Sequence, residues 1–375
     1  MLSAAGEFEG SSLSVMGLVL TVKAPVTSCF PCPSVEFPPM RPYNVEFKSA
    51  RRWISLAFVL QVLGCATGQT TPGAVGVPVQ PFRLAFVQTR THATYTLEIR
   101  NWIFTMDSEG KNVRDLKLDG SYPSWSPDGK KIAFSSAKDE THAELYVSDP
   151  DGSHIQRLTR RKGGTGVSRP VWSPDGRQIA FFALVGRIPE IFVVNCDGGE
   201  ATQVSSGGGI YPTWSPDSRK IAFASARNGS IQLYSFNLDG SGLLQLTNMK
   251  SGASEPAWSP DGNKILFTVV EGVGSEGVAT IGILDVSSLK TTRFAYSDKF
   301  NFFSPTWSPD GRTVLMELSR KGGFFLQTSD PYVPPAEKVI GWKHQIIAVS
   351  VDGAVSRQLT KADDGGTQPS AGKMP

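Results

Sequence analysis

Short, mostly apolar segments of five or six residues recur along the chain from about residue 81 onward. Clusters rich in Gly, Pro, Asp and Ser separate them, and KIAFSSA (131–137) and ELYVS (144–148) are typical segments. Apolar runs of this length between turn-forming residues predict β-strands rather than helices. We therefore expect an all-β fold made of short strands joined by tight turns.

A six-residue pattern repeats five times within this region. Trp-Ser-Pro-Asp recurs at spacings of 47, 42, 44 and 49 residues, with a proline two residues before each tryptophan. A near-constant period indicates one supersecondary unit per copy. The repeated residues are Trp125, Trp172, Trp214, Trp258 and Trp307, with the aspartates Asp128, Asp175, Asp217, Asp261 and Asp310.

Each copy contains four short strand segments, a, b, c and d. In one copy these are residues 122–126, 131–137, 144–148 and 155–159. Ser126-Pro127-Asp128-Gly129 fits a type I turn between strands a and b, because Pro presets φ at the second position and Gly tolerates positive φ. A four-stranded antiparallel unit that repeats every 42–49 residues is typical of a β-propeller blade.

The two ends of the repeat region complete one further blade. Residues 82–87, 102–106 and 113–118 match strands b, c and d, and Gln368–Ala371 matches strand a with Ala in place of Trp. Pairing of these segments would close the ring and remove its exposed edges. We predict a six-bladed propeller over residues 81–371, followed by a tail at 372–375.

The repeated residues have a structural and a functional interpretation. The tryptophans could form a ligand cage, but their identical position in every copy favours a core between blades. The aspartates could form a ring of acids, but side-chain capping of the turn is the simpler role. The prolines suit a strand that lines the central channel, where no ladder donor is needed.

An apolar segment without charge precedes the repeats. Residues 53–64 (WISLAFVLQVLG) follow Lys48, Arg51 and Arg52 and are followed by Cys65. This order is typical of a secretory signal, and residues 62–65 resemble the lipobox of bacterial lipoproteins, which implies lipidation of Cys65 and sorting to the outer membrane. The alternative is a short buried strand or core helix.

These features divide the start of the chain into three parts. We expect residues 1–39 to be a misassigned upstream extension, 40–65 to be a lipoprotein signal and 66–80 to be a flexible tether. The segment 40–65 begins at Met40, as a signal of ordinary length would.

Charge and residue types argue against several functions. A net charge of +3 is too small to predict a nucleic-acid surface. We find no G-x-S-x-G, no H-E-x-x-H and no phosphate loop, and the four histidines fall in different blades or loops. We therefore expect a binding module with no catalytic residue, cofactor or metal. The alternatives are a sugar-active lyase or hydrolase that uses the channel, and a purely structural envelope lipoprotein.

Two aromatic segments suggest a partner-binding surface. The expected loop 298–303 and an insertion at 320–341 belong to neighbouring blades and should meet at the channel mouth, where aromatic residues could form an interface core. The alternatives are a local plug that buries its own aromatic residues and a disordered insertion. The candidates are Phe300, Phe302, Phe303, Phe324, Phe325 and Tyr332.

The motif Pro-x-Trp-Ser-Pro-Asp-Gly, with its KIAF-type and LT-type strands, closely resembles the propeller of the TolB family over residues 81–371. The resemblance implies an exported, non-enzymatic, protein-binding propeller of the periplasm. An envelope protein is then the expected partner, with a peptidoglycan-associated lipoprotein as the candidate, and we expect a monomer. Two features differ from that family, which is soluble and carries an α/β domain before its propeller.

Overall fold

The computed structural model describes residues 81–93, 97–138, 142–160, 166–271, 278–297, 299–320, 344–353, 356–360 and 366–374. The predicted signal, tether and Cys65 lie outside the described residues, as do Phe324, Phe325 and Tyr332. All described residues belong to one compact unit that spans residues 75–375.

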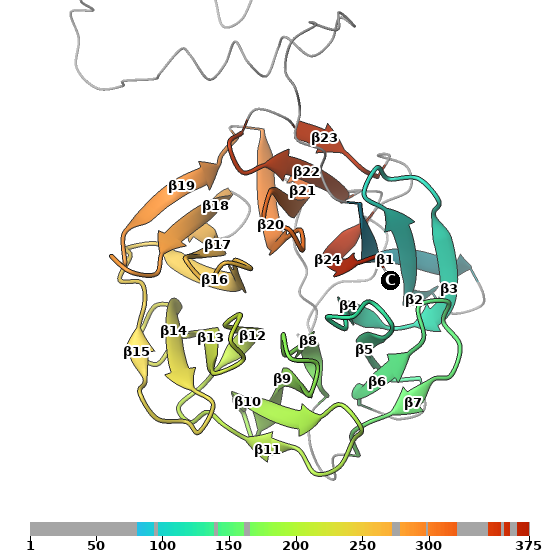
Figure 1. Ribbon diagram of the computed structural model, residues 1–375, viewed down its shortest axis with the longest axis horizontal. Coiled ribbons are helices and arrows are strands. Elements are labelled where there is room, and N and C mark those ends of the chain that lie inside the picture. Colours follow the sequence, from blue (N-terminus) through green and yellow to red (C-terminus); the bar gives the residue numbers. More distant parts are fainter. Residues whose placement is uncertain are drawn as a thin grey trace, which may run out of the picture. The chain divides into compact units, whose positions relative to one another are not determined.

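Six four-stranded antiparallel sheets surround a central axis, which confirms the predicted six-bladed propeller (Figure 1). Blade 1 contains β24 (Thr367–Lys373), β1 (Phe82–Ala93), β2 (Leu97–Asp107) and β3 (Arg114–Asp119). Blade 2 contains β4 (Ser121–Trp125), β5 (Ile132–Ser136), β6 (Glu144–Ser148) and β7 (Gln156–Arg157). Blade 3 contains β8 (Ser168–Trp172), β9 (Gln178–Val185), β10 (Ile188–Asn195) and β11 (Thr202–Gln203).

The remaining three blades follow in chain order. Blade 4 contains β12 (Ile210–Trp214), β13 (Lys220–Ser225), β14 (Gln232–Asn237) and β15 (Leu244–Gln245). Blade 5 contains β16 (Gly252–Trp258), β17 (Lys264–Glu271), β18 (Val278–Asp285) and β19 (Thr291–Ala295). Blade 6 contains β20 (Phe300–Trp307), β21 (Thr313–Arg320), β22 (Gln345–Ser350) and β23 (Ser356–Gln358).

The two ends of the propeller sequence pair within blade 1. Strand β24 runs antiparallel to β1, with Phe82 opposite Lys373 and Val87 opposite Thr367. The closure prediction is confirmed, although the strand continues two residues beyond Ala371 into the expected tail. Gly372 allows close packing here, because a Cβ at this position would lie 2.3 Å from the Trp125 ring. The joint between the chain ends is therefore packed like the other blade contacts.

The hydrophobic core consists of six clusters, one at each junction between neighbouring blades. Successive residues of a strand point to opposite faces of the sheet. The second strand of each blade therefore contributes side chains to the core clusters on both sides of that blade. In β5, Ile132 and Phe134 join the cluster with blade 1, whereas Ala133 joins the cluster with blade 3. The repeated Ile-Ala-Phe pattern thus places a small residue against the large residues of the next blade.

The repeated tryptophan links five of the six inner strands to the inner strand of the preceding blade, and β24 has Ala371 at this position. Trp125, Trp172, Trp214 and Trp307 are buried and Trp258 is partly buried. Three main-chain N–H groups donate to a hydroxyl of the preceding strand: Trp125 to Ser370 (3.3 Å), Trp172 to Ser124 (3.4 Å) and Trp258 to Thr213 (3.3 Å). Where that strand has an apolar residue, the indole N–H donates to its main-chain carbonyl: Trp214 to Val171 (3.1 Å) and Trp307 to Ala257 (3.0 Å).

The repeated aspartate lies in the turn between the first two strands of its blade. Asp128 accepts a hydrogen bond from the Ser126 hydroxyl at 2.6 Å and one from the Lys130 main-chain N–H at 3.1 Å. The serine bond, against a smaller opposing effect of burial, holds the pKa of Asp128 below its ordinary value. Gly129 follows with φ of 69°, a conformation that glycine adopts without strain.

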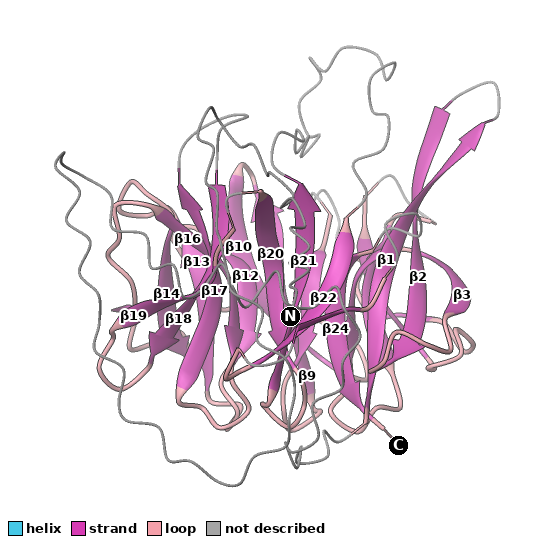
Figure 2. Cartoon of the chain, turned by 90° about the horizontal axis from the view of Figure 1, so that it is seen from above, coloured by secondary structure: helices cyan, strands magenta, loops and turns pink. Residues whose placement is uncertain are grey.

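The two faces of the propeller carry different connections. Because the strands alternate in direction, the a–b and c–d turns share one face and the b–c and d–a loops share the other. Figure 2 shows the C-terminal end of the chain, which follows β24, on the lower side. The end of β1 and the beginning of β2 project on the upper side. We call the side of the b–c and d–a connections the loop face.

Candidate functional site

Every inner strand contains a bulge at the residue that precedes its proline. The pairing register with the second strand shifts there in all six blades. Proline has no N–H to donate to the ladder, and the residue before it adopts a left-handed φ. These residues are Tyr122 (54°), Arg169 (50°), Tyr211 (57°), Glu255 (51°), Ser304 (47°) and Gln368 (55°), which we call the channel ring.

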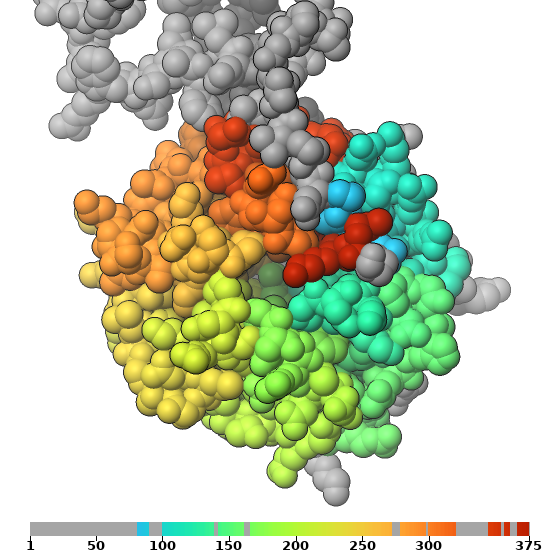
Figure 3. All heavy atoms as spheres, in the orientation of Figure 1, coloured from blue at the N-terminus to red at the C-terminus, as the bar shows by residue number. Residues whose placement is uncertain are grey.

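The channel ring surrounds a cavity on the propeller axis. Its volume is about 160 Å³, and the lining comes from the same three consecutive positions of all six inner strands. Figure 3 shows the hollow at the centre of the turn face, where the blades meet. The lining comprises the channel ring, the prolines Pro123, Pro170, Pro212, Pro256, Pro305 and Pro369, and the next residues Ser124, Val171, Thr213, Ala257, Thr306 and Ser370.

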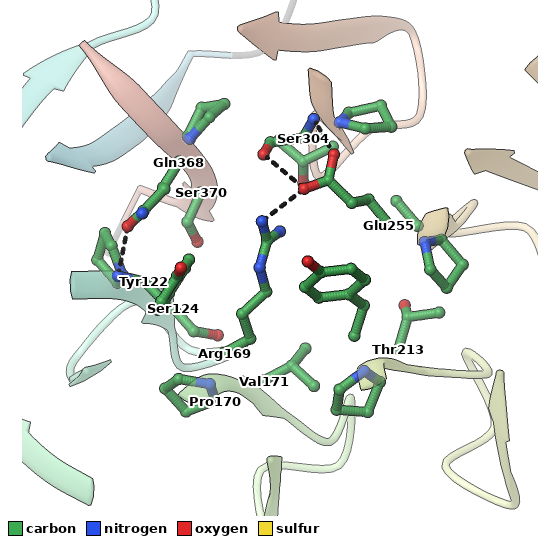
Figure 4. Close-up of a pocket in the computed structure, with 18 residues that line it drawn as sticks. Tyr122, Ser124, Arg169, Pro170, Val171, Thr213, Glu255, Ser304, Gln368 and Ser370 are labelled. Carbon is green, nitrogen blue, oxygen red and sulfur yellow. Dashed lines mark hydrogen bonds and ion pairs between the residues drawn. The ribbon is translucent and has the colours of Figure 1, made fainter. Parts of the chain in front are cut away.

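An ion pair joins two members of the channel ring from different blades. Arg169 on β8 reaches Glu255 on β16, with 2.5 Å between Nη2 and Oε1 (Figure 4). The second carboxylate oxygen accepts from the Ser304 main-chain N–H at 2.7 Å and from the Thr268 hydroxyl at 2.8 Å. Glu255 is therefore held by three other strands and fixes the end of the Arg169 side chain.

Two aromatic rings enclose the guanidinium of Arg169. Its central carbon lies 4.2 Å from the centre of the Tyr211 ring and 4.8 Å from that of Tyr122. A cation above an aromatic face is attracted by the ring quadrupole. The side chain of Arg169 is 21% exposed and that of Glu255 is 11% exposed, so the charged groups have left most of their water.

One fully buried donor atom of Arg169 has no protein acceptor. Its Nε is buried and makes no hydrogen bond with any residue that the structure describes. Such groups are rare in folded proteins and call for an explanation in each case.

The environment shifts the pKa values of both charged groups. Burial would raise the pKa of Glu255, but the charge of Arg169 and the bonds from Ser304 and Thr268 outweigh it and lower the pKa below 4.5. Burial would lower the pKa of Arg169, but Glu255 and the two tyrosines raise it above its ordinary value. Both groups are thus charged at neutral pH.

The closing strand supplies the last member of the channel ring. The side-chain oxygen of Gln368 accepts the Tyr122 main-chain N–H at 2.7 Å. The main-chain N–H of Gln368 donates to the buried Glu317 at 3.3 Å, which also contacts His344. Formation of the channel ring therefore requires that the chain ends have paired.

The chemistry of this cavity is that of recognition by hydrogen bonds. Arg169 and Glu255 are the two charged side chains among its lining residues, and the rest are Tyr, Gln, Ser, Thr, Pro, Val and Ala. In the described ranges no three His, Cys, Asp or Glu side chains lie close enough to hold a metal ion. The lining therefore combines one compensated ion pair with neutral hydrogen-bonding groups.

The prediction that residues 300–303 belong to a loop is wrong. These residues belong to strand β20 rather than to a loop, because they extend the pairing with β21. Phe302 is 8% exposed and lies in the core between blades 5 and 6, so its side chain cannot contact a partner. Phe300 and Phe303 are half-buried, and their role in partner binding stays a prediction.

The channel ring was not identified from the sequence. Its signal is the residue before each strand-a proline, which differs between copies while the surrounding motif stays the same. The sequence did place the prolines at the channel, but not the bulge that directs their neighbours inward.

Comparisons with known proteins place this geometry among propellers. A family model described as TolB beta propeller domain matches residues 82–211 and 169–333. A search of curated protein sequences found no match. Similar solved structures include TolB from Acinetobacter baumannii, with 24% identity, a TM-score of 0.59, and coverage of 78% of this chain and 67% of that one.

Two further structures share the fold. A putative TolB from Agrobacterium tumefaciens has 20% identity and a TM-score of 0.56, and the match covers 77% of this chain and 91% of that one. Hydrazine synthase of Kuenenia stuttgartiensis has 15% identity and a TM-score of 0.57, with coverage of 78% and 47%. Separately, no described helix is long and apolar enough to span a bilayer.

Removal of the Glu255 charge should destabilise the propeller. In Glu255→Gln the Arg169 charge stays buried without its counterion, and loss of one partner of a buried pair costs about 3 kcal/mol. Denaturant unfolding at neutral pH measures this loss. The matched control is Glu271→Gln, whose ion pair with Arg293 is about half exposed on both sides and should change stability by less than about 1 kcal/mol.

The same comparison has a defined pH dependence. A carboxylate with a lowered pKa stabilises the fold above its unfolded pKa, and this contribution is lost as pH falls through the folded pKa. The difference between wild type and Glu255→Gln should therefore be complete at neutral pH and shrink below pH 4.5. A difference that stays constant down to acid pH would contradict the assigned ion pair.

Proposed function

This chain belongs to the TolB beta propeller domain family, and on that basis we propose that it is a protein-interaction module of the bacterial cell envelope. The TolB-like propeller supports a role in protein interaction in general. The proposal adds a location, which is the periplasm at the outer membrane, and a partner class, which is an envelope protein such as a peptidoglycan-associated lipoprotein.

The channel ring is the observation that carries the proposal. Six equivalent strands present six side chains at one backbone position, and those side chains include an acid, a base, an amide, a hydroxyl and two phenols. A symmetric scaffold thereby presents one asymmetric polar site. Rigid scaffolds with variable positions of this kind are suited to specific binding.

The loop face is the proposed docking side. The channel ring lies within the inner strands, three residues before the tryptophan that ends β4, β8, β12, β16 and β20. Phe300 and Phe303 begin strand β20 on the same side, and Tyr296 in the preceding connection is 56% exposed. Aromatic residues are enriched at the core of protein interfaces.

A photo-crosslinking experiment tests the docking side. A benzoylphenylalanine placed at Tyr296 should capture an envelope protein in intact cells, and one placed at exposed Lys130 in an a–b turn should not. Mass spectrometry identifies the captured partner. Equal capture at both positions, or capture at Lys130 alone, would contradict a partner on the loop face.

We propose that a lipid attached to Cys65 anchors the protein to the outer membrane. The support is the order of basic residues, apolar segment and cysteine in residues 48–65. Cys65→Ser should move the protein from the membrane fraction to the soluble fraction and abolish labelling by an alkyne-tagged fatty acid. Cys196→Ser is the control, because Cys196 lies in the propeller and its loss should leave both unchanged. Membrane retention and labelling of Cys65→Ser would refute the anchor.

A further inference from the structure

We propose that the loop face of blades 3 to 5 is a contact surface for an anionic lipid bilayer. This inference concerns the propeller itself and goes beyond the proposed function, in which only Cys65 attaches the protein to a membrane. The surface consists of four exposed aliphatic and two exposed basic side chains, which we call the amphiphilic arc: Val185, Arg187, Ile188, Ile231, Lys250 and Val270.

The aliphatic members of the arc lie at the ends of strands on the loop face. Val185 ends β9 and Ile188 begins β10. Ile231 directly precedes β14, and Val270 is the next-to-last residue of β17. Each of the four is between 38% and 51% exposed. Apolar side chains that gather on a surface mark a contact with a protein or a membrane.

Backbone contacts between blades join these positions into one surface. The Gly209 N–H donates to the Pro189 carbonyl at 2.7 Å and holds blade 4 beside the start of β10. The Ala253 N–H donates to the Ile231 carbonyl at 2.8 Å and holds blade 5 beside the start of β14. The residue before Ala253 pairs with Val270 within blade 5. The arc is therefore continuous across three neighbouring blades.

The charged side chains of this surface are mainly basic. Arg187 and Lys250 are exposed, and Arg227 is partly buried. The connections from β9 to β10, β11 to β12, β13 to β14 and β15 to β16 contain no acidic residue. Glu271, at the end of β17, is paired with Arg293 at 3.8 Å. The arc thus has the charge that attracts anionic lipid headgroups.

The composition of the arc favours a bilayer over a protein partner. The cores of protein interfaces are enriched in aromatic residues and depleted in lysine, whereas the arc contains branched aliphatic residues and Lys250. Val185 and Ile188 flank the two-residue tip of the β9–β10 hairpin, where Gly186 has a φ of 64°. Such a tip can place aliphatic side chains among lipid chains while the long side chain of Arg187 stays at the headgroups.

Bilayer contact through the arc is compatible with a protein partner. Blades 6, 1 and 2 lie across the ring from blades 3, 4 and 5 (Figure 1). A propeller that meets the bilayer through blades 3 to 5 therefore keeps the loops on the other side of the ring free. Tyr296 lies in the connection that leads from blade 5 to blade 6.

Vesicle flotation of residues 66–375 tests the proposal. This segment contains all six blades, which belong to one compact unit, and it lacks Cys65 and the apolar residues 53–64. It should bind vesicles of phosphatidylglycerol and phosphatidylcholine in equal amounts about 25-fold more tightly than phosphatidylcholine vesicles, because Arg187 and Lys250 each contribute about fivefold near an anionic surface. Salt should weaken this binding because it screens the charges.

Single substitutions with matched controls assign the binding to the arc. Lys250→Gln should weaken binding to the phosphatidylglycerol vesicles about fivefold, and Ile188→Ser about tenfold through the loss of apolar area. Lys290→Gln and Leu243→Ser should bind like the unsubstituted protein. Both control residues lie in c–d turns on the opposite face, Lys290 is also exposed, and Leu243 is 52% exposed against 51% for Ile188. Thermal unfolding checks that each variant folds.

Several results would overturn the inference. They are equal binding to both kinds of vesicle, no binding to either, and an equal loss in the matched controls. Capture of an envelope protein by a benzoylphenylalanine at Ile188 in intact cells would assign the arc to a protein and overturn it as well. Capture at Tyr296 without vesicle binding would refute only the bilayer contact, whereas vesicle binding without capture at Tyr296 would refute only the docking of a protein partner.

Discussion

The proline in each inner strand is the constraint on which the rest of this structure depends. Proline cannot donate to the ladder, so the strand can carry it only at an edge or a bulge. In this propeller the inner strand forms a bulge, and the preceding residue takes a φ between 47° and 57°. For residues other than glycine this conformation costs about 1–3 kcal/mol. Six such residues together form the wall of one cavity.

The packing between blades provides the energy that offsets this strain. Four of the six junctions bury the large residues of one blade against an alanine of the preceding one, as with Phe134 against Ala85, and the other two have Leu266 and Leu315 there. The tryptophans add hydrogen bonds between inner strands, which fix the strands in register. The core is thus repeated six times, while the channel ring has five residue types at its six positions. Stability and the proposed specificity thus depend on different residues.

Much of this architecture could be predicted from the sequence, because it is repeated. Period, turn chemistry and the fit of the two chain ends determine the blade count and the closing strand. Phe302 was wrongly assigned to a loop because its aromatic segment occurs in only one copy of the repeat. The repeat pattern therefore does not indicate where that segment lies. Pairing with β21 decides its place, and Phe302 lies opposite Leu318.

The ion pair could not be predicted for a different reason. Arg169 and Glu255 are 86 residues apart, and each appears once, so no repeat indicates that they meet. Only the ring geometry brings blades 3 and 5 together at the axis. The bulge has a signal in the sequence, the residue before each proline, but a backbone angle is needed to show that it points inward.

Stability measurements on Ser304 test the strained channel ring most directly. Ser304→Gly and Ser304→Ala both remove the hydroxyl, but only glycine relieves a left-handed φ of 47°. The glycine variant should therefore be the more stable of the two by about 1 kcal/mol. At Ser254, an ordinary strand position in β16, alanine should instead exceed glycine by up to about 1 kcal/mol. If alanine equals or exceeds glycine at Ser304 as well, the bulge does not hold the channel ring as described.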